Sequence, residues 1–257
     1  MRIVIKIGTS TLAYSTGHLN IRHIENFCKV VSDIKNAGCE VIVVSSGAVG
    51  MGMGKLSLKE RPKELSLKQA AAAVGQCELM YTYGKLFGEY NHTVAQVLLT
   101  AENFRDPEQH ENFTNTVNRL LELGVIPIIN ENDTVAVNEL IIGDNDTLAA
   151  IVAESVKADS LVLLSDIDGL FTADPRKNPD AKLIPVIDEI TPEIEQLAGG
   201  SASSVGTGGM VTKLEAAKIG MKAGFDMIIT NGSDPSILYD VIDGKAVGTR
   251  FTGGKNR

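Results

Sequence analysis

Six short apolar runs alternate with longer stretches of helical pattern along this chain of 257 residues. The runs are nearly continuous in apolar residues, as expected of parallel strands that helices cover on both faces, and lie at 3–7, 41–45, 94–100, 125–130, 161–165 and 226–230. Helical patterns fill the intervals at 21–37, 66–84, 112–123, 145–157 and 211–223. This alternation predicts an α/β fold, a three-layer αβα sandwich with a central, mainly parallel sheet.

The composition narrows the class of partner and compartment. The formal net charge is −8 and the isoelectric point about 5.1, whereas a nucleic-acid-binding protein needs a basic surface, so we expect no nucleic-acid partner. No apolar run approaches the roughly 18–20 residues that span a bilayer, so we expect no membrane segment. Three cysteines without a CxxC pair and four histidines without metal-ligand spacing indicate a reducing, cytoplasmic setting and no protein metal site.

Small and hydroxylated residues follow three of the predicted strands, at Gly8-Thr9-Ser10, Ser45 to Gly50, and Ser165-Asp166. A glycine after a strand is most often only part of a turn. In open parallel sheets, however, ligands bind outside the carboxyl ends of the strands, where glycine lets a ligand approach the backbone and free N–H groups attract anions. Three such loops on one edge favour a binding site there.

A fourth loop, GTGGMVTK at 206–213, leads directly into the last predicted helix. A flexible glycine loop, a helix N-terminus and a lysine in the first turn together suit a phosphate group. The order of a Walker A motif is absent, and no GxGxxG follows a strand directly. The alternative interpretation is that Lys213 is an ordinary solvated lysine.

Lys6 lies inside the apolar run IVIKI. It could reach solvent from an edge strand along its aliphatic stem. Alternatively, the strand directs its ammonium group to the ligand edge beside Gly8. Because burying an uncompensated ammonium is costly, a fixed negative partner is then expected. Together, Lys6 and Lys213 would supply two positive charges for a phosphoryl group.

Two clusters of acidic and amide residues, at 130–133 and 144–146, flank two short apolar runs that predict a β-hairpin. Turns and helix caps explain some of these residues, but seven exceed that need and suit a polar, zwitterionic substrate. No serine, histidine and acid form a nucleophile motif. A carboxylate acceptor would need no general base, because its pKa of roughly 4 leaves it ionised. Catalysis would then rest on positioning and charge stabilisation, with Mg²⁺ bridging the phosphates of a nucleotide such as ATP.

Several motifs together resemble those of the amino acid kinase family and, within it, of the glutamate 5-kinases. The resemblance runs through nearly the whole chain, in VIKIGTSTL, VIVVSSGAVGMGM, QAAAAVGQ, IPIINENDTV, IGDNDTLAA, LLSDIDGLFTADPR, GTGGMVTKLEAA and VGTRF. It implies the amino acid kinase fold and phosphorylation of the γ-carboxylate of L-glutamate by ATP, the first step of proline biosynthesis.

The resemblance also implies roles for individual residues. Lys6 and Lys213 would stabilise charge on the transferring phosphoryl group, and Asp146 would orient both lysines. The residues implied for glutamate are Ser46, Gly47, Asn145 and Asp133, the last as partner of the α-ammonium group. The residues implied for the nucleotide are Lys6, Gly8, Ser165, Asp166, Thr207, Gly208, Gly209, Met210, Val211, Thr212 and Lys213. Mg²⁺ is expected on the ATP phosphates rather than on protein ligands.

We expect a single domain over 1–257, with an amino-acid-substrate lobe at approximately 1–155 and a nucleotide lobe at approximately 156–257. Many glutamate 5-kinases carry an additional C-terminal PUA domain, which this sequence is expected to lack. Besides glutamate and ATP, the resemblance implies further copies of the chain, in a dimer or tetramer. It also implies proline as a feedback inhibitor, whose site would overlap that of glutamate, and a downstream glutamyl phosphate reductase.

Two alternatives remain open on the sequence. The first is another enzyme of the same fold, such as an acetylglutamate, aspartate, carbamate or nucleoside monophosphate kinase. A free α-amine calls for an acidic partner such as Asp133, whereas an N-acetylated substrate does not. The second is a non-catalytic amino-acid or nucleotide sensor. A degenerate sensor would have lost one of Lys6, Asp146 and Lys213, and all three are present.

Overall fold

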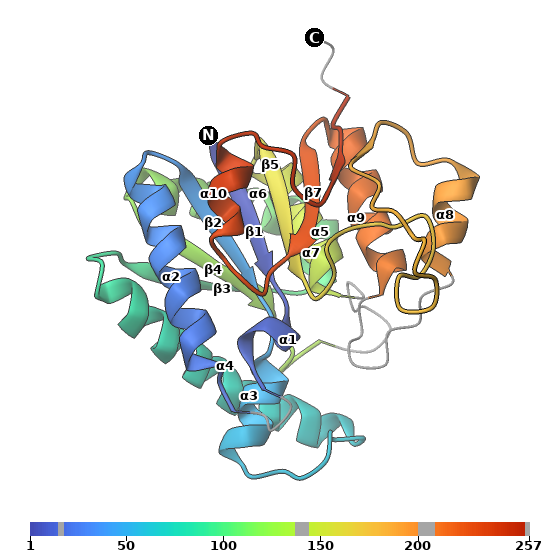
Figure 1. The fold of residues 1–257 in the computed structure, drawn as a ribbon. Coiled ribbons are helices and arrows are strands. Elements are labelled where there is room, and N and C mark those ends of the chain that lie inside the picture. The colour runs from blue at the N-terminus through green and yellow to red at the C-terminus, as the bar shows by residue number, and fades with distance from the viewer. Residues whose placement is uncertain (15–17, 137–143, 200–208, 255–257) are drawn as a thin grey trace.

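A central sheet of eight strands organises the molecule, seen in a computed structural model that describes residues 1–14, 18–136, 144–199 and 209–254 (Figure 1). The strand order is β3-β4-β2-β1-β5-β7-β8-β6. The strands are β1 Arg2–Ile7, β2 Glu40–Ser45, β3 Val94–Leu99, β4 Ile126–Glu131, β5 Ser160–Ser165, β6 Val186–Ile187, β7 Asp226–Asn231 and β8 Thr249–Phe251. Among the described strands every pair is parallel except β7 with β8.

Helices cover both faces of this sheet, so the predicted three-layer αβα sandwich is confirmed (Figure 1). One layer contains α2 (Ile21–Asn36), α4 (Leu65–Gly88) and α10 (Ile237–Ile242), whose buried residues include Phe27, Leu79 and Leu238. The opposite layer contains α6 (Pro107–Glu122), α7 (Asn145–Ser155), α8 (Pro192–Gly199) and α9 (Met210–Ala223).

The central strands are apolar along most of their length because both of their faces are buried. Val4 of β1 belongs to one hydrophobic core, while its neighbours Ile3 and Ile5 belong to the core on the other side. Successive side chains of a strand point to opposite faces of a sheet, so a strand between two helical layers needs apolar residues at nearly every position.

A short helix, α3 (Ala48–Lys55), packs against α4 so closely that glycine is required at the contact. A Cβ atom at Gly75 would lie 1.8 Å from the carbonyl oxygen of Ala48, and one at Gly52 would lie 1.7 Å from that of Ala71. The sequence predicts a loop from Ser45 to Gly50, and this is wrong from Ala48 onward, where α3 begins. The other short helices are α1 (Thr9–Leu12) and α5 (Ala101–Arg105).

All six predicted strands are present, with ends within one residue of the predicted ones. The sequence did not indicate the two short strands β6 and β8. The predicted hairpin between 134 and 143 lies largely outside the described residues. Within the described part of the chain, no helix has both the length and the apolar character that crossing a bilayer requires.

Candidate functional site

The carboxyl ends of three adjacent strands meet at one edge of the sheet. Strand β1 lies between β2 and β5, and Lys6 is in register with Val44 on one side and Leu163 on the other. Lys6 is therefore on a central strand, which rules out the alternative that it reaches solvent from a sheet edge. These ends point toward the part of the molecule that holds α1 and α3 (Figure 1).

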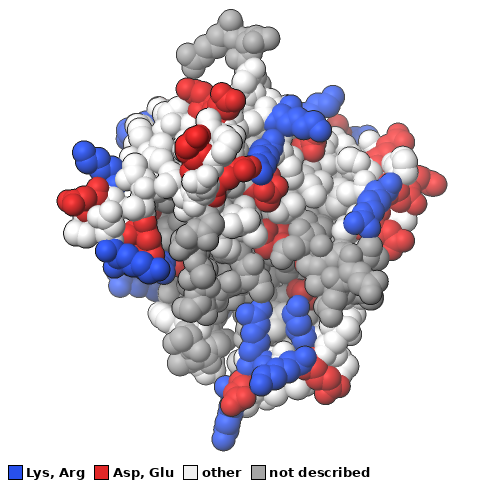
Figure 2. All heavy atoms as spheres, turned by 90° about the vertical axis from the view of Figure 1, so that its right-hand side faces the viewer, with Lys and Arg blue, Asp and Glu red and all other residues white. Residues whose placement is uncertain are grey.

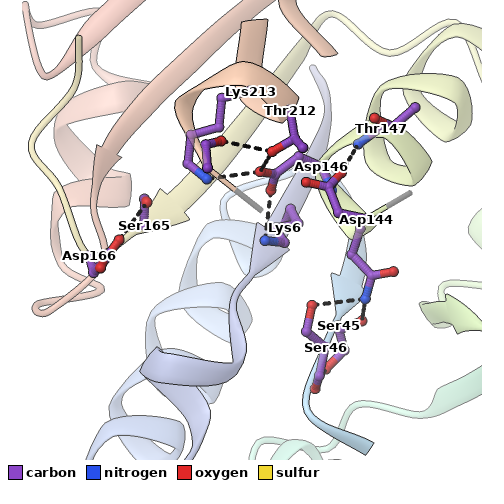
Figure 3. Close-up of polar contacts among 12 residues, drawn as sticks. Lys6, Ser45, Ser46, Asp144, Asp146, Thr147, Ser165, Asp166, Thr212 and Lys213 are labelled. Carbon is purple, nitrogen blue, oxygen red and sulfur yellow. Dashed lines mark hydrogen bonds and ion pairs between the residues drawn. The ribbon is translucent and has the colours of Figure 1, made fainter. Parts of the chain in front are cut away.

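Lys6, Asp146 and Lys213 come together from three different elements at this edge (Figure 3). The Lys6 Nζ atom lies 2.7 Å from Asp146 Oδ1, and the Lys213 Nζ atom lies 2.8 Å from Asp146 Oδ2. The exposed fraction of the side chain is 12% for Lys6, 8% for Lys213 and 1% for Asp146. One carboxylate thus holds two nearly buried ammonium groups, and this carboxylate is the negative partner expected for Lys6.

The electrostatics of this cluster favour binding of an anion. Burial by itself raises the pKa of Asp146, but the ammonium groups of Lys6 and Lys213 outweigh burial and lower the pKa to about 2. Asp146 is therefore ionised at neutral pH. Two ammonium groups against one carboxylate leave a net positive charge on the cluster, which suits a phosphoryl group that gathers negative charge.

The N-terminus of α7 presents Asp146 in this position. Asp144 is the N-cap residue, and its Oδ1 atom accepts hydrogen bonds from the backbone N–H groups of Asp146 and Thr147 at 3.1 Å and 3.0 Å. An Asp at an N-cap satisfies N–H groups that have no partner within the helix. On the other side of the cluster, Thr212 Oγ1 donates to Gly209 O and lies 3.4 Å from Asp146 Oδ2.

Asn145 connects α7 to the end of β2. The two hydrogens of its Nδ2 group are shared among three acceptors, Ser45 O and Ser46 Oγ at 2.8 Å each and Asn130 Oδ1 at 2.9 Å. The backbone carbonyl of Ser45 can only accept, so the orientation of the Asn145 amide is fixed. Because Ser46 Oγ accepts from Asn145, the hydroxyl hydrogen of Ser46 remains available to donate to a ligand oxygen. Gly47, which follows, has a φ of 94° and precedes α3.

Two further contacts of α4 support the ends of β2 and β4, and sequence reasoning missed them. Asn130 Nδ2 donates to Gln76 Oε1 at 3.0 Å, and Tyr83 Oη lies 3.0 Å from Ser45 Oγ. The Ser45 hydroxyl donates to Ser46 O, so Tyr83 is the donor to Ser45. A glutamine in the alanine-rich stretch QAAAAVGQ was the available signal for Gln76. Nothing in the sequence distinguished Tyr83 from an ordinary core tyrosine.

Asp133 lies two residues beyond the end of β4. Burial raises the pKa of its carboxyl group, and the positive charges of Lys68 and Arg61 partly offset the increase. Such a half-buried carboxylate is suited to binding an ammonium group.

The residues implied for the nucleotide lie on three elements. Ser165 ends β5, and its hydroxyl donates to Asp166 Oδ1 at 3.2 Å (Figure 3). Gly8 follows β1 as the N-cap of α1. Gly209 is the N-cap of α9. Of the next four residues, Met210 and Lys213 are buried, Thr212 is partly buried and Val211 is exposed. Thr207 and Gly208 lie outside the described residues.

Among the described residues, no three His, Cys, Asp or Glu side chains approach one another as the ligands of a metal ion would. An ion such as Mg²⁺, which keeps several waters and binds phosphate oxygens, does not require such a protein site.

The model of the amino acid kinase family matches residues 1–231 of the chain. The chain is 53% identical to a glutamate 5-kinase of Clostridium perfringens, over 99% of this chain and 96% of that protein. It is 54% identical to a glutamate 5-kinase of Listeria innocua, over 99% of this chain and 94% of that protein.

Two solved structures are similar in fold. A carbamate kinase from Giardia lamblia bound to AMP-PNP has a TM-score of 0.70 at 18% identity and covers 98% of both chains. A UMP kinase from Bacillus anthracis has a TM-score of 0.66 at 16% identity, covering 98% of this chain and 96% of its own. At such low identities the likeness supports the fold alone.

Proposed function

The chain belongs to the amino acid kinase family, and from this membership we propose that it phosphorylates the γ-carboxylate of L-glutamate with ATP. The products are L-glutamyl 5-phosphate and ADP, in the first step of proline biosynthesis. Identities of 53% and 54% to glutamate 5-kinases over 99% of the chain support this substrate over the other acceptors of the fold.

The observation that carries the chemistry is the Asp146 carboxylate held between Lys6 and Lys213. A γ-carboxylate oxygen of glutamate attacks the γ-phosphorus of ATP and forms a new O–P bond. The bond between that phosphorus and the β,γ-bridging oxygen breaks, and ADP keeps the electron pair. No proton is removed from the acceptor, because glutamate is already ionised. The two ammonium groups stabilise the charge that gathers on the phosphoryl and bridging oxygens.

Glutamate binds over the N-terminal half of the sheet, in contact with Ser46, Gly47, Asn145 and Asp133. The Ser46 hydroxyl donates to the acceptor carboxylate, since Asn145 already donates to its oxygen. Asp133 binds the α-ammonium group. This assignment gives the two ends of the substrate different partners, which fixes which carboxylate faces the phosphoryl donor.

ATP binds over the C-terminal half, from about residue 156 onward, against Gly8, Ser165, Asp166 and the segment 207–213. Lys6 and Lys213 contact the phosphates from opposite sides. Mg²⁺ supplies further charge neutralisation when it binds the phosphate oxygens, and we expect phosphates and water, rather than protein side chains, as its ligands.

Three further partners belong to this proposal. The chain forms a homo-oligomer, proline inhibits by competing with glutamate, and a reductase consumes the labile acyl phosphate. The reaction takes place in the cytoplasm, in keeping with the three free thiols of Cys28, Cys39 and Cys77.

The test is ADP release with ATP and Mg²⁺ against L-glutamate, N-acetylglutamate, aspartate and UMP, with hydroxylamine present to trap an acyl phosphate. Hydroxamate that forms with L-glutamate but not with N-acetylglutamate is the expected result. Turnover of another acceptor in preference to glutamate would refute the substrate. No turnover of any acceptor would refute catalysis and favour a sensor. Added proline tests inhibition in the same assay.

A further inference from the structure

Two cations of the α3–α4 segment stand near Asp133 without contacting it. Lys68 and Arg61 are the cations that act on the Asp133 carboxyl group. Nevertheless, no Lys or Arg nitrogen of the described residues lies within 4.0 Å of the Asp133 carboxylate. The charges of Lys68 and Arg61 thus act on Asp133 through space, without forming an ion pair with it.

Neither cation has an acidic partner of its own. Within the described part of the chain, no carboxylate lies within ion-pair distance of Lys68 or Arg61. Arg61 is exposed, but Lys68 is partly buried. A bound anion would therefore be the first ion-pair partner of either cation among the described residues.

The packing of α3 on α4 fixes the backbone that carries Lys68. Lys68 ends the first turn of α4, one turn before Ala71, whose carbonyl oxygen abuts Gly52 of α3. Helix α3 begins directly after Ser46 and Gly47, so the same rigid contact positions the cation and the acceptor end of the site. Figure 2 shows Lys and Arg side chains gathered on the end of the molecule where Figure 1 places α3 and the start of α4.

An α-amino acid carries an ammonium group and a carboxylate on one carbon atom. If Asp133 binds the ammonium group, the α-carboxylate lies beside it and needs a positive partner. The lysines of the catalytic cluster do not serve, because both are held on Asp146 at the phosphoryl side. We propose that Lys68, assisted by Arg61, binds the α-carboxylate of the substrate and so makes the enzyme selective for an α-amino acid.

This inference rests on the proposed function and adds a determinant of specificity to it. Two analogues of glutamate separate the contributions. 4-Aminobutyrate keeps the amine and the acceptor carboxylate but lacks the α-carboxylate. Glutarate keeps both carboxylates but lacks the amine. Their inhibition constants against L-glutamate are measured for wild type, Lys68→Met, Arg61→Gln and Asp133→Asn, with Lys59→Met as a control for loss of an exposed lysine in the same segment.

In Lys68→Met we expect KM for glutamate and Ki for glutarate to rise about 10- to 100-fold, as for loss of a hydrogen bond to a charged group. The Ki for 4-aminobutyrate and the KM for ATP should stay within about 2-fold of wild type. Arg61→Gln gives the same pattern with a smaller change, and Lys68→Arg restores much of the glutarate affinity. Asp133→Asn gives the reverse pattern, with weaker binding of 4-aminobutyrate and little change for glutarate. Lys59→Met changes neither.

The inference would be overturned if Lys68→Met lost equal affinity for both analogues or lost affinity for neither. A rise in KM for ATP that matched the rise in KM for glutamate would also overturn it. If Lys68→Met does not fold, as judged by its thermal unfolding, the exposed Arg61→Gln decides by the same two constants. A wild-type enzyme without glutamate turnover would instead refute the proposed function, and the inference with it.

Discussion

The Lys6 ammonium group and the Asp146 carboxylate form a 2.7 Å ion pair inside the protein, although β1 and α7 are far apart in the sequence. The pair holds a positive charge where phosphoryl transfer needs it. We expect Lys6→Ala to lower kcat/KM by about 10²- to 10³-fold, because a positioned charge stabiliser is lost. Lys213 still pairs with Asp146, so the variant should fold.

Steady-state ADP release measures this effect, and Lys29→Ala, which removes an exposed lysine of α2, is the matched control. A Lys6→Ala enzyme within a few-fold of wild type would contradict the role of Lys6.

Tyr83 provides a second prediction, because its hydroxyl group connects α4 to the acceptor loop. It donates to Ser45 Oγ from a side chain with no exposed surface. Tyr83→Phe removes only this oxygen, leaving Ser45 without its buried donor. We expect KM for glutamate to rise by about 3- to 10-fold, in line with a net hydrogen bond of roughly 1 kcal/mol, while KM for ATP is unchanged.

The exposed Tyr81 lies two residues earlier on the same helix, so Tyr81→Phe is the control and should behave as wild type. Equal changes in both Michaelis constants would mean that Tyr83 contributes to stability without positioning Ser45.

The parts of the fold that the sequence predicted depend on local patterns. Runs buried on both faces are apolar at nearly every position, so the six main strands could be located to within one residue. Helix α9 likewise ends at Gly224, whose φ of 86° is one that glycine adopts readily. Short elements such as β8 escaped notice because they owe their existence to pairing with a distant strand.

The candidate site was predicted less completely, for a related reason. Lys6 and Lys213 could be selected because charged residues are conspicuous in apolar or glycine-rich surroundings, whereas Asp146 stood among other acidic and amide residues and received its role from the family resemblance. Their contacts could not be derived from spacing, because they depend on the packing of α7 against β1 and of α9 against α7. Gln76 and Tyr83 act through other residues, and only the three-dimensional arrangement indicates what they touch.

The close contact between α3 and α4 gives a third prediction. A methyl group at Gly75 would collide with the backbone of Ala48, so Gly75→Ala must push α3 away from α4. We expect the free energy of unfolding to fall by about 1–3 kcal/mol, as in other overpacked contacts. Because α3 follows the acceptor loop, KM for glutamate should rise more than KM for ATP.

Urea unfolding and steady-state kinetics measure the two effects. Gly84 of the same helix is exposed, with its nearest neighbour 4.0 Å from an added Cβ atom, so Gly84→Ala should stabilise the protein by roughly 0.5–1 kcal/mol. If Gly75→Ala were equally stabilising, the contact would not be as close as described.

Asp133 gives a prediction in which stability and binding change in opposite directions. Burial raises its pKa above the ordinary value of 3.8, despite the opposing charges of Lys68 and Arg61. The folded protein therefore binds the Asp133 proton more tightly than the unfolded chain does, and the stability from this group falls as pH rises through that window. At pH 7, Asp133→Asn should raise Tm.

The same variant, Asp133→Asn, should raise KM for glutamate about 10- to 100-fold by removing the partner of the α-ammonium group. In wild type, KM for glutamate should also rise on acidification as Asp133 becomes protonated, at a pH above that of an ordinary aspartate. Thermal unfolding and the pH profile of KM provide the measurements, and a profile unaltered in Asp133→Asn would refute the assignment of Asp133 to the amine.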